Sequence, residues 1–369
     1  MDPFLRTAAP RLISSTGFSK SSPSRRAPPM SGAHTASVGS LEAPETPGAV
    51  AEASCAPDDK IANDIGCVRR FLYQCDHQGF LELTQETWQN RWFPNQICLQ
   101  GDVASLAQLN DRDLEFYRFL FTFLGMAERL VNFNIDDLIP LFKSHDVEHY
   151  YTEQEAMENI HGRVYANILN MFFKNNPATA LDYAYDIVRD PALRRKLNWL
   201  HGRVRATTNR GQKVLLFLVI EGMFFVSSFY VIGLLRVRGL FPGVCLANDY
   251  ISRDEQLHTR AAAMLFNTLV LAKHRPSAAW IQDLLREAVD VEMQFIQAKG
   301  KGVTLVNFTD IRNFLQATAD RILREISVPP IYGTTPPAEC PLAYTGCIKS
   351  TNFFERESSD YSTFVANDL

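Results

Sequence analysis

The pattern Glu-x-x-His occurs twice in this chain, and it constrains the fold more than any other sequence feature. Glu158 is followed three residues later by His161, and Glu255 is followed at the same spacing by His258. Both copies lie in segments with helical periodicity, and residues three apart on an α-helix share a face. Two such pairs that face each other, with one carboxylate from each of two further helices, would enclose two metal ions.

Two further glutamates supply the missing carboxylates. Glu128 and Glu221 each lie in the apolar stripe of a predicted helix, where an unpaired carboxylate would be costly. A lone buried glutamate more often pairs with an arginine, and a lone helical histidine is more often an ordinary core residue. Their joint occurrence on four predicted helices favours metal binding, because iron and manganese sites favour carboxylate with imidazole. The predicted ligands are Glu128, Glu158, His161, Glu221, Glu255 and His258.

The chain divides by composition into three parts. Residues 1–60 are rich in Ser, Pro and Ala, and we expect a disordered extension because such a segment cannot bury enough apolar surface to offset its ordering entropy. Residues 61–330 show no convincing alternating strands and predict an all-α, ferritin-like helical bundle. Residues 331–369 are predicted to be a flexible tail. The main predicted helices cover 111–133, 149–173, 214–235, 246–272, 277–298 and 310–326, and Asp190-Pro191 predicts a further helix start.

The apolar segment 214–235 has the length of a membrane span. At about 1.5 Å per residue it would extend about 33 Å, enough to cross a bilayer. Its one charged residue is Glu221, and an ionisable group at that depth of a membrane is costly and usually functional. Because this glutamate also completes the ligand set, we interpret the segment as a buried core helix of a soluble protein.

Composition excludes some partners and compartments. The formal net charge of −4 gives no general basic surface, so we expect no nucleic-acid partner. The seven cysteines are odd in number and scattered, without a Cys-x-x-Cys pair, which indicates reduced thiols in a cytosol-like compartment. We also expect no secretory signal at the N-terminus.

The residues around the predicted ligands resemble the small subunit of class I ribonucleotide reductase. The resemblance rests on four short runs: ISRDEQLH at 251–258, EGMFF at 221–225, ENIH at 158–161 followed by Tyr165, and TNFFE at 351–355. It extends from about residue 65 to the C-terminus. The runs AERLVNFN at 127–134 and NDL at 367–369 are similar to the herpesvirus branch, nearest to gammaherpesviruses.

This resemblance implies an oxidoreductase subunit whose di-iron centre activates O2 and forms a stable tyrosyl radical. A separate large subunit would use that radical to reduce ribonucleoside diphosphates to deoxyribonucleoside diphosphates for viral DNA synthesis, so this chain alone should reduce nothing. The small subunit would be a homodimer in the host cell cytoplasm. Tyr165 would hold the radical, although a core tyrosine is the default interpretation of such a residue. Phe225, Phe229 and Ile251 would form a dry pocket around it.

The resemblance also implies a route by which the radical leaves the subunit. It would run from the metal through His161 and Asp254 to Trp92, and onward through Tyr361 to the large subunit. Tryptophan and tyrosine can both be oxidised, and Asp254 can orient the imidazole as a hydrogen-bond acceptor. The tail from Tyr361 to Leu369 would dock on the large subunit, whereas a solvated C-terminus is the alternative.

Glu128 departs from the family pattern, because most small subunits have Asp at this position. A longer carboxylate can chelate or bridge metal ions differently. We expect two iron ions because Tyr165 is retained, and a manganese–iron centre remains an alternative.

Three other functions compete with this interpretation. His145, Glu148 and His149 match the His-x-x-Glu-His pattern of some zinc proteases, which would need both histidines on one helix face and a third ligand downstream. A di-metal oxidase or a ferritin-like store would use the same ligands without a large-subunit partner. A viral protein that keeps the scaffold without catalysis is the third, and the complete ligand set argues against it.

Overall fold

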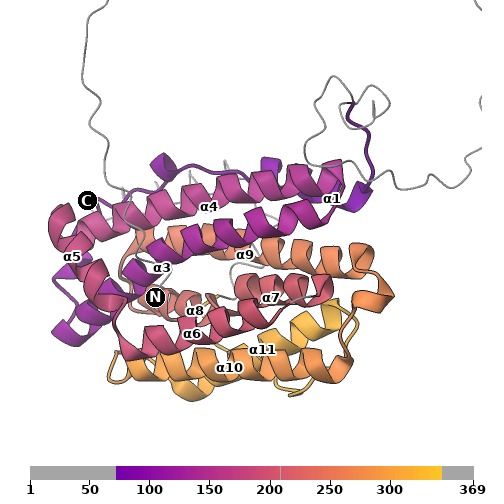
Figure 1. Ribbon diagram of the computed structural model, residues 1–369. Helices are drawn as coiled ribbons and strands as arrows, with labels where there is room; N and C mark the ends of the chain where they lie inside the picture. Colours follow the sequence, from indigo (N-terminus) through magenta and orange to yellow (C-terminus); the bar gives the residue numbers. More distant parts are fainter. Residues whose placement is uncertain (1–71, 208, 343–369) are drawn as a thin grey trace, which may run out of the picture. The chain divides into compact units, whose positions relative to one another are not determined.

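The computed structural model describes residues 72–207 and 209–342, in which every regular element is a helix and no strand occurs (Figure 1). The prediction of an all-α chain is therefore confirmed for these residues. The α-helices are α1 (Gln78–Gln89), α2 (Val103–Leu106), α3 (Asp111–Leu138), α4 (His145–Phe172), α5 (Pro177–Ile187), α6 (Pro191–Ala206), α7 (Arg210–Met223), α8 (Val226–Val237), α9 (Pro242–Leu269), α10 (Ala278–Gly300) and α11 (Phe308–Glu325). Short 3-10 turns lie at Pro94–Gln96, Ile139–Leu141 and Ala272–His274.

Short polar side chains fix where several helices begin. The Asn110 side chain accepts a hydrogen bond from a backbone N–H in the first turn of α3, and Asp190 does the same for α6, as its sequence predicts. The Ser144 hydroxyl accepts from Val147 N at 3.1 Å and starts α4 at His145. The predicted start of this helix near residue 149 was therefore wrong by one turn, because the cap lies upstream of the periodic apolar residues.

Four helices enclose the centre of the bundle. Figure 1 shows α3 running beside α4, and α7 packs along α9. Further contacts join α3 to α7 and α4 to α9, so these four helices share one buried interior. The helix α1 lies against α4 and α9, while α6 and α11 pack on α10. The four inner helices are those that carry the predicted metal ligands.

The apolar segment 214–235 is buried, as predicted, but it is two helices rather than one. The chain leaves α7 after Met223 and enters α8 at Val226, with Phe224 and Phe225 in the turn between them. Apart from the partly buried Val226, the segment is buried inside the protein, which is the environment expected of a core element and not of a membrane span. Hydropathy did not predict the break, because the contact that stabilises it comes from another helix: Lys196 Nζ donates to Phe224 O at 2.6 Å.

The beginning of the predicted tail is attached to α11. The Asp320 carboxylate accepts hydrogen bonds from the backbone N–H groups of Ile331, Tyr332 and Gly333. The extension 1–60 and the rest of the tail, 343–369, lie outside the described residues, and the division of the chain into three parts stays a prediction.

Two aspartates join the start of α4 to the segment before α1. The Asp146 carboxylate is buried and accepts hydrogen bonds from the N–H groups of Asp76 and His77 and from the Tyr73 hydroxyl, each at 2.7 Å. In return, the Asp76 carboxylate accepts from the Ser144 hydroxyl at 2.7 Å. Burial alone would raise the pKa of Asp146, but these donors outweigh it and lower that pKa to about 2.

We expect Asp146→Asn to lower the free energy of unfolding by about 2 kcal/mol at pH 7. The folded pKa lies below the unfolded value of about 3.9, so the contribution is complete above about pH 4 and disappears as the pH falls toward 2. Urea unfolding of wild type and variant between pH 6 and pH 3 measures this difference. Asp182→Asn, at an exposed position of α5, is the control. A stability difference that is the same at pH 3 and pH 6 would contradict the assignment.

Candidate metal centre

The six predicted ligands come together in the interior of the four inner helices. Glu128 comes from α3, Glu158 and His161 from α4, Glu221 from α7, and Glu255 and His258 from α9, and all six are buried. They form two groups in which the potential ligand atoms lie within 4.8 Å of one another. One group is Glu128, Glu158, His161 and Glu255, and the other is Glu158, Glu221, Glu255 and His258.

Two carboxylates are common to both groups. Glu158 Oε2 lies 3.1 Å from His161 Nδ1, while its other oxygen, Oε1, lies 3.0 Å from His258 Nδ1. Glu255 repeats this arrangement, with Oε1 at 3.3 Å from His161 Nδ1 and Oε2 at 3.4 Å from His258 Nδ1. Each shared carboxylate therefore presents one oxygen to each histidine, which is the arrangement needed to bridge two cations.

The remaining two carboxylates belong to one group each. Glu128 Oε2 lies 3.7 Å from His161 Nδ1, and Glu221 Oε2 lies 3.8 Å from His258 Nδ1. The centre thus has approximate two-fold symmetry, with one histidine, one unshared glutamate and two shared glutamates around each position.

The donor atoms of this cluster fit metal ions better than they fit one another. Five of them are buried and, although some lie 3–4 Å from one another, make no hydrogen bond of suitable geometry within the described structure: Glu128 Oε2, Glu158 Oε1, Glu221 Oε2, Glu255 Oε2 and His258 Nδ1. Unsatisfied buried polar atoms are rare because each costs desolvation free energy. Two divalent cations would compensate for the four carboxylates, and oxygen with imidazole donors suits iron or manganese.

Burial and crowding perturb the ionisation of these ligands. Burial raises the pKa of Glu128 and Glu221 well above the usual range, and nearby carboxylates add to this effect. Burial would lower the pKa of His161, but hydrogen bonds to the surrounding carboxylates, beginning with Asp254, raise it well above its usual value. A cluster without cations would therefore retain protons, and metal binding would displace them.

A hydrogen-bonded chain leads from the cluster to Trp92. The indole Nε1–H of Trp92 donates to Asp254 Oδ2 at 2.7 Å, and the same oxygen lies 3.2 Å from His161 Nε2. The Trp92 ring also stacks on His161, with 6.0 Å between ring centroids. Trp92 is 1% exposed, whereas Trp88, one turn earlier in sequence, is 55% exposed. The structure thus brings together three of the residues that the resemblance assigned to radical transfer, while Tyr361 lies outside the described residues.

Tyr165 lies on the ligand-bearing helix α4 and is buried. Its hydroxyl has no hydrogen-bond partner among the described residues, and burial raises its pKa well above the usual range, so the phenol is neutral. Phe225, Phe229 and Ile251 are also buried in the core. Their role as a radical pocket stays a prediction.

Sequence reasoning missed two neighbours of this centre. The ring of Phe121 lies 6.4 Å from that of Tyr165, and Gln154 Nε2 donates to Glu221 Oε1 at 3.2 Å. Both follow the helical repeat of a ligand: Phe121 precedes Glu128 by seven residues, and Gln154 precedes Glu158 by four. That spacing was the available signal.

The His-x-x-Glu-His motif does not join a metal group among residues 72–207 and 209–342. It occupies the first turns of α4, where Glu148 and His149 are exposed. The rings of His145 and His149 stack on Tyr73, at 6.2 and 5.2 Å between centroids. The described residues therefore supply no third ligand for a zinc site here.

Comparisons with known proteins agree with this geometry. Residues 69–341 match the family model described as ribonucleotide reductase, small chain. The chain is 68% identical over 302 residues to the ribonucleoside-diphosphate reductase small subunit of Equine herpesvirus 2, covering 82% of this chain and 99% of that protein. The corresponding protein of Human herpesvirus 8 type P is 66% identical with the same coverage.

A solved structure supports the fold at much lower identity. The ribonucleotide reductase Rnr4 homodimer from Saccharomyces cerevisiae is 20% identical and has a TM-score of 0.65, covering 79% of this chain and 89% of that chain. The predicted fold class, a ferritin-like bundle with a buried cluster for two metal ions, is confirmed at this level.

Proposed function

Because this chain belongs to the ribonucleotide reductase small-chain family, we propose that it is the radical-generating subunit of a ribonucleoside-diphosphate reductase. The observation that carries the proposal is the pair of ligand groups that share Glu158 and Glu255. A second, large subunit would bind the nucleotide and reduce it, so this chain would be active only in the complex.

We propose that Glu128, Glu158, His161, Glu221, Glu255 and His258 hold two metal ions. When bound in the reduced state, these ions would react with O2, which is the oxidant. The shared glutamates would set the separation of the ions, and Gln154 would orient Glu221 through its hydrogen bond. Two irons are our first proposal, and a manganese–iron pair is the alternative because Glu128 replaces the more common Asp.

Tyr165 would store the oxidising equivalent as a neutral phenoxyl radical. Its burial excludes water and reductants, and its hydroxyl makes no hydrogen bond among the described residues that would hold its proton. Trp92 would then carry the equivalent toward the large subunit, since Asp254 joins its indole to His161. A transfer route through Trp92 would distinguish the protein from an oxidase or an iron store, because neither needs to pass an oxidising equivalent to a second subunit.

We further propose that the subunit forms a homodimer in the host cell cytoplasm and binds the large subunit through the tail from Tyr361 to Leu369. The homodimeric assembly of the yeast Rnr4 structure supports the first part. The burial of the segment 214–235 is consistent with a soluble protein. No nucleic-acid partner is proposed.

Electron paramagnetic resonance tests this function directly. Protein loaded anaerobically with ferrous iron and then exposed to O2 should show a tyrosyl signal, and Tyr165→Phe should remove it. Tyr151→Phe, which alters another buried tyrosine of α4, is the matched control and should keep the signal. Metal uptake without a tyrosyl signal in wild type would indicate an oxidase or ferritin-like function, and no metal uptake would refute the metal centre.

A further inference from the structure

A buried ion pair lies beside the break between α7 and α8. Lys196 of α6 and Glu292 of α10 are 2.6 Å apart (Nζ to Oε2), and their side chains are 3% and 0% exposed. Three aromatic rings surround the ammonium group, with centroids 4.5–5.1 Å from Nζ: Phe123, Phe224 and Phe295. No residue of this pair belongs to the metal cluster.

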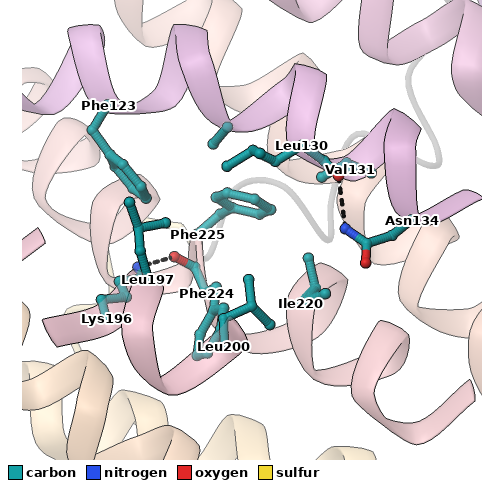
Figure 2. A pocket seen from close by; sticks show the side chains of 11 residues that line it. Phe123, Leu130, Val131, Asn134, Lys196, Leu197, Leu200, Ile220, Phe224 and Phe225 are labelled. Carbon is teal, nitrogen blue, oxygen red and sulfur yellow. Dashed lines mark hydrogen bonds between the residues drawn. The ribbon is translucent and has the colours of Figure 1, made fainter. Parts of the chain in front are cut away.

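The Lys196–Glu292 pair forms hydrogen bonds with backbone or side-chain groups on both sides of the break between α7 and α8. Lys196 Nζ donates to Phe224 O at 2.6 Å, as the dashed line in Figure 2 shows, and so satisfies a carbonyl at the end of α7. On the other side, the Ser227 hydroxyl in the first turn of α8 donates to Glu292 Oε1 at 2.5 Å. The two helix ends are therefore tied to α6 and α10 through one connected set of hydrogen bonds.

Stability alone does not explain a charge pair at this place. Removing two charges from water costs roughly as much as their attraction returns, and apolar replacements are often neutral or stabilising. Apolar side chains could fill the same space among the three rings, but they could not donate to the Phe224 carbonyl or accept from Ser227. What the pair adds is a defined geometry for the break.

That geometry bears on the unshared glutamate Glu221 and on the packing of Phe225. Glu221 lies three residues before Phe224, in the last turn of α7. The ring of Phe225 lines a crevice together with Leu130 and Val131 of α3, the helix that also carries Glu128 (Figure 2). A shift of the break would therefore move Glu221 directly and change the packing of Phe225 against α3.

We propose that Lys196 and Glu292 are positioning residues for the metal centre, which fix the helix break and thereby the placement of Glu221 and the Phe225 ring. The inference rests on the proposed function, because it assigns the cluster to metal ions. It predicts that the pair affects metal affinity and radical lifetime more than it affects folding.

The test compares single variants with a double variant that restores an uncharged core. Lys196→Met and Glu292→Gln each leave one partner of the pair behind, whereas Lys196→Met/Glu292→Leu removes both charges. The control is Lys299→Met/Asp190→Asn, because these residues form a 2.7 Å ion pair between the same two helix regions, at the start of α6 and the end of α10. Thermal unfolding, Mn²⁺ titration of the metal-free protein, and decay of the tyrosyl signal in hydroxylamine are measured for each.

We expect the double variant to unfold at nearly the wild-type temperature. Its affinity for the more weakly bound of the two Mn²⁺ ions should be about 10-fold lower than in wild type. Its tyrosyl signal should decay about 10-fold faster, and the control should match wild type in both. Wild-type affinity and decay in a folded double variant would overturn the proposal. If the double variant does not fold, Ser227→Ala decides: a change in the same direction supports the proposal, and wild-type values overturn it.

The Mn²⁺ titration separates this inference from the proposed function. A wild-type protein that takes up metal but forms no tyrosyl radical would refute the radical-generating role. The positioning role would still be supported by weaker Mn²⁺ binding in the double variant, or overturned by unchanged binding.

Discussion

Glu158→Gln should abolish the binding of both metal ions, because this carboxylate offers one oxygen to each ligand group. Glutamine has the same shape but no negative charge, and its amide would direct hydrogen-bond donors at one of the two positions. Loss of one partner of a buried charged set costs about 3–5 kcal/mol, which corresponds to an affinity loss on the order of 1,000-fold. Glu128→Gln, which alters an unshared ligand, should weaken one ion much more than the other.

Metal analysis and calorimetric titration of the purified variants measure this difference. Glu148→Gln is the matched control, since it lies on the same helix but is exposed and outside both groups. It should bind two ions per chain as wild type does, and the same variant tests the zinc-protease alternative. If Glu158→Gln and Glu128→Gln lost metal equally at both positions, the bridging assignment would be wrong.

Trp92→Phe should separate radical formation from radical use. Phenylalanine fills most of the buried volume but has no N–H to donate to Asp254 and is much harder to oxidise. We expect the variant to bind metal and form the tyrosyl radical, and to lose about 100-fold of the reductase activity measured with the large subunit, which is the upper end of the range for losing a hydrogen-bonded neighbour of a metal ligand.

A second tryptophan, Trp88, provides the matched control for the reductase assay. Trp88→Phe changes the same side chain at an exposed position of α1 and should leave both the radical and the activity intact. Equal losses in the two variants would point to a shared structural effect on α1 and the segment that follows it, and not to a transfer route. A Trp92→Phe protein without metal would show that the indole is needed for the structure of the centre itself.

The features that could be predicted from the sequence are local in origin. The spacing of Glu158 to His161 places both side chains on one face of a helix whatever the rest of the chain does, because the backbone repeat sets side-chain direction. Glu128 and Glu221 could be assigned to buried faces because they lie within apolar stripes, and a buried carboxylate needs a positively charged partner such as a metal ion. The clustering of the six predicted ligands followed from these patterns, and the all-α structure followed from the run of helical segments without alternating strands.

Other features depend on contacts between residues far apart in the chain. Lys196 and Phe224 are 28 positions apart, and Lys196 and Glu292 are 96 apart, so no local pattern indicates that they meet. The apolar run 214–235 therefore predicted one helix, whereas the carbonyl at its middle is satisfied by a lysine from α6. Similarly, Trp92 was predicted instead of Trp88 because of its position in the family pattern, and no local feature of the sequence separates the two. In the structure, Trp92 is the one that donates a hydrogen bond to Asp254, 162 residues away.

The sequence by itself determined the chemistry of the centre: the ligand types, the helices that carry them and the buried tyrosine that follows them on α4. Only the tertiary structure decided which glutamates face both histidines, where the core helix breaks, and which tryptophan connects with the centre. The physical reason is that helical periodicity is set by each segment's own backbone, whereas sharing a carboxylate or satisfying a carbonyl depends on how separate helices pack together.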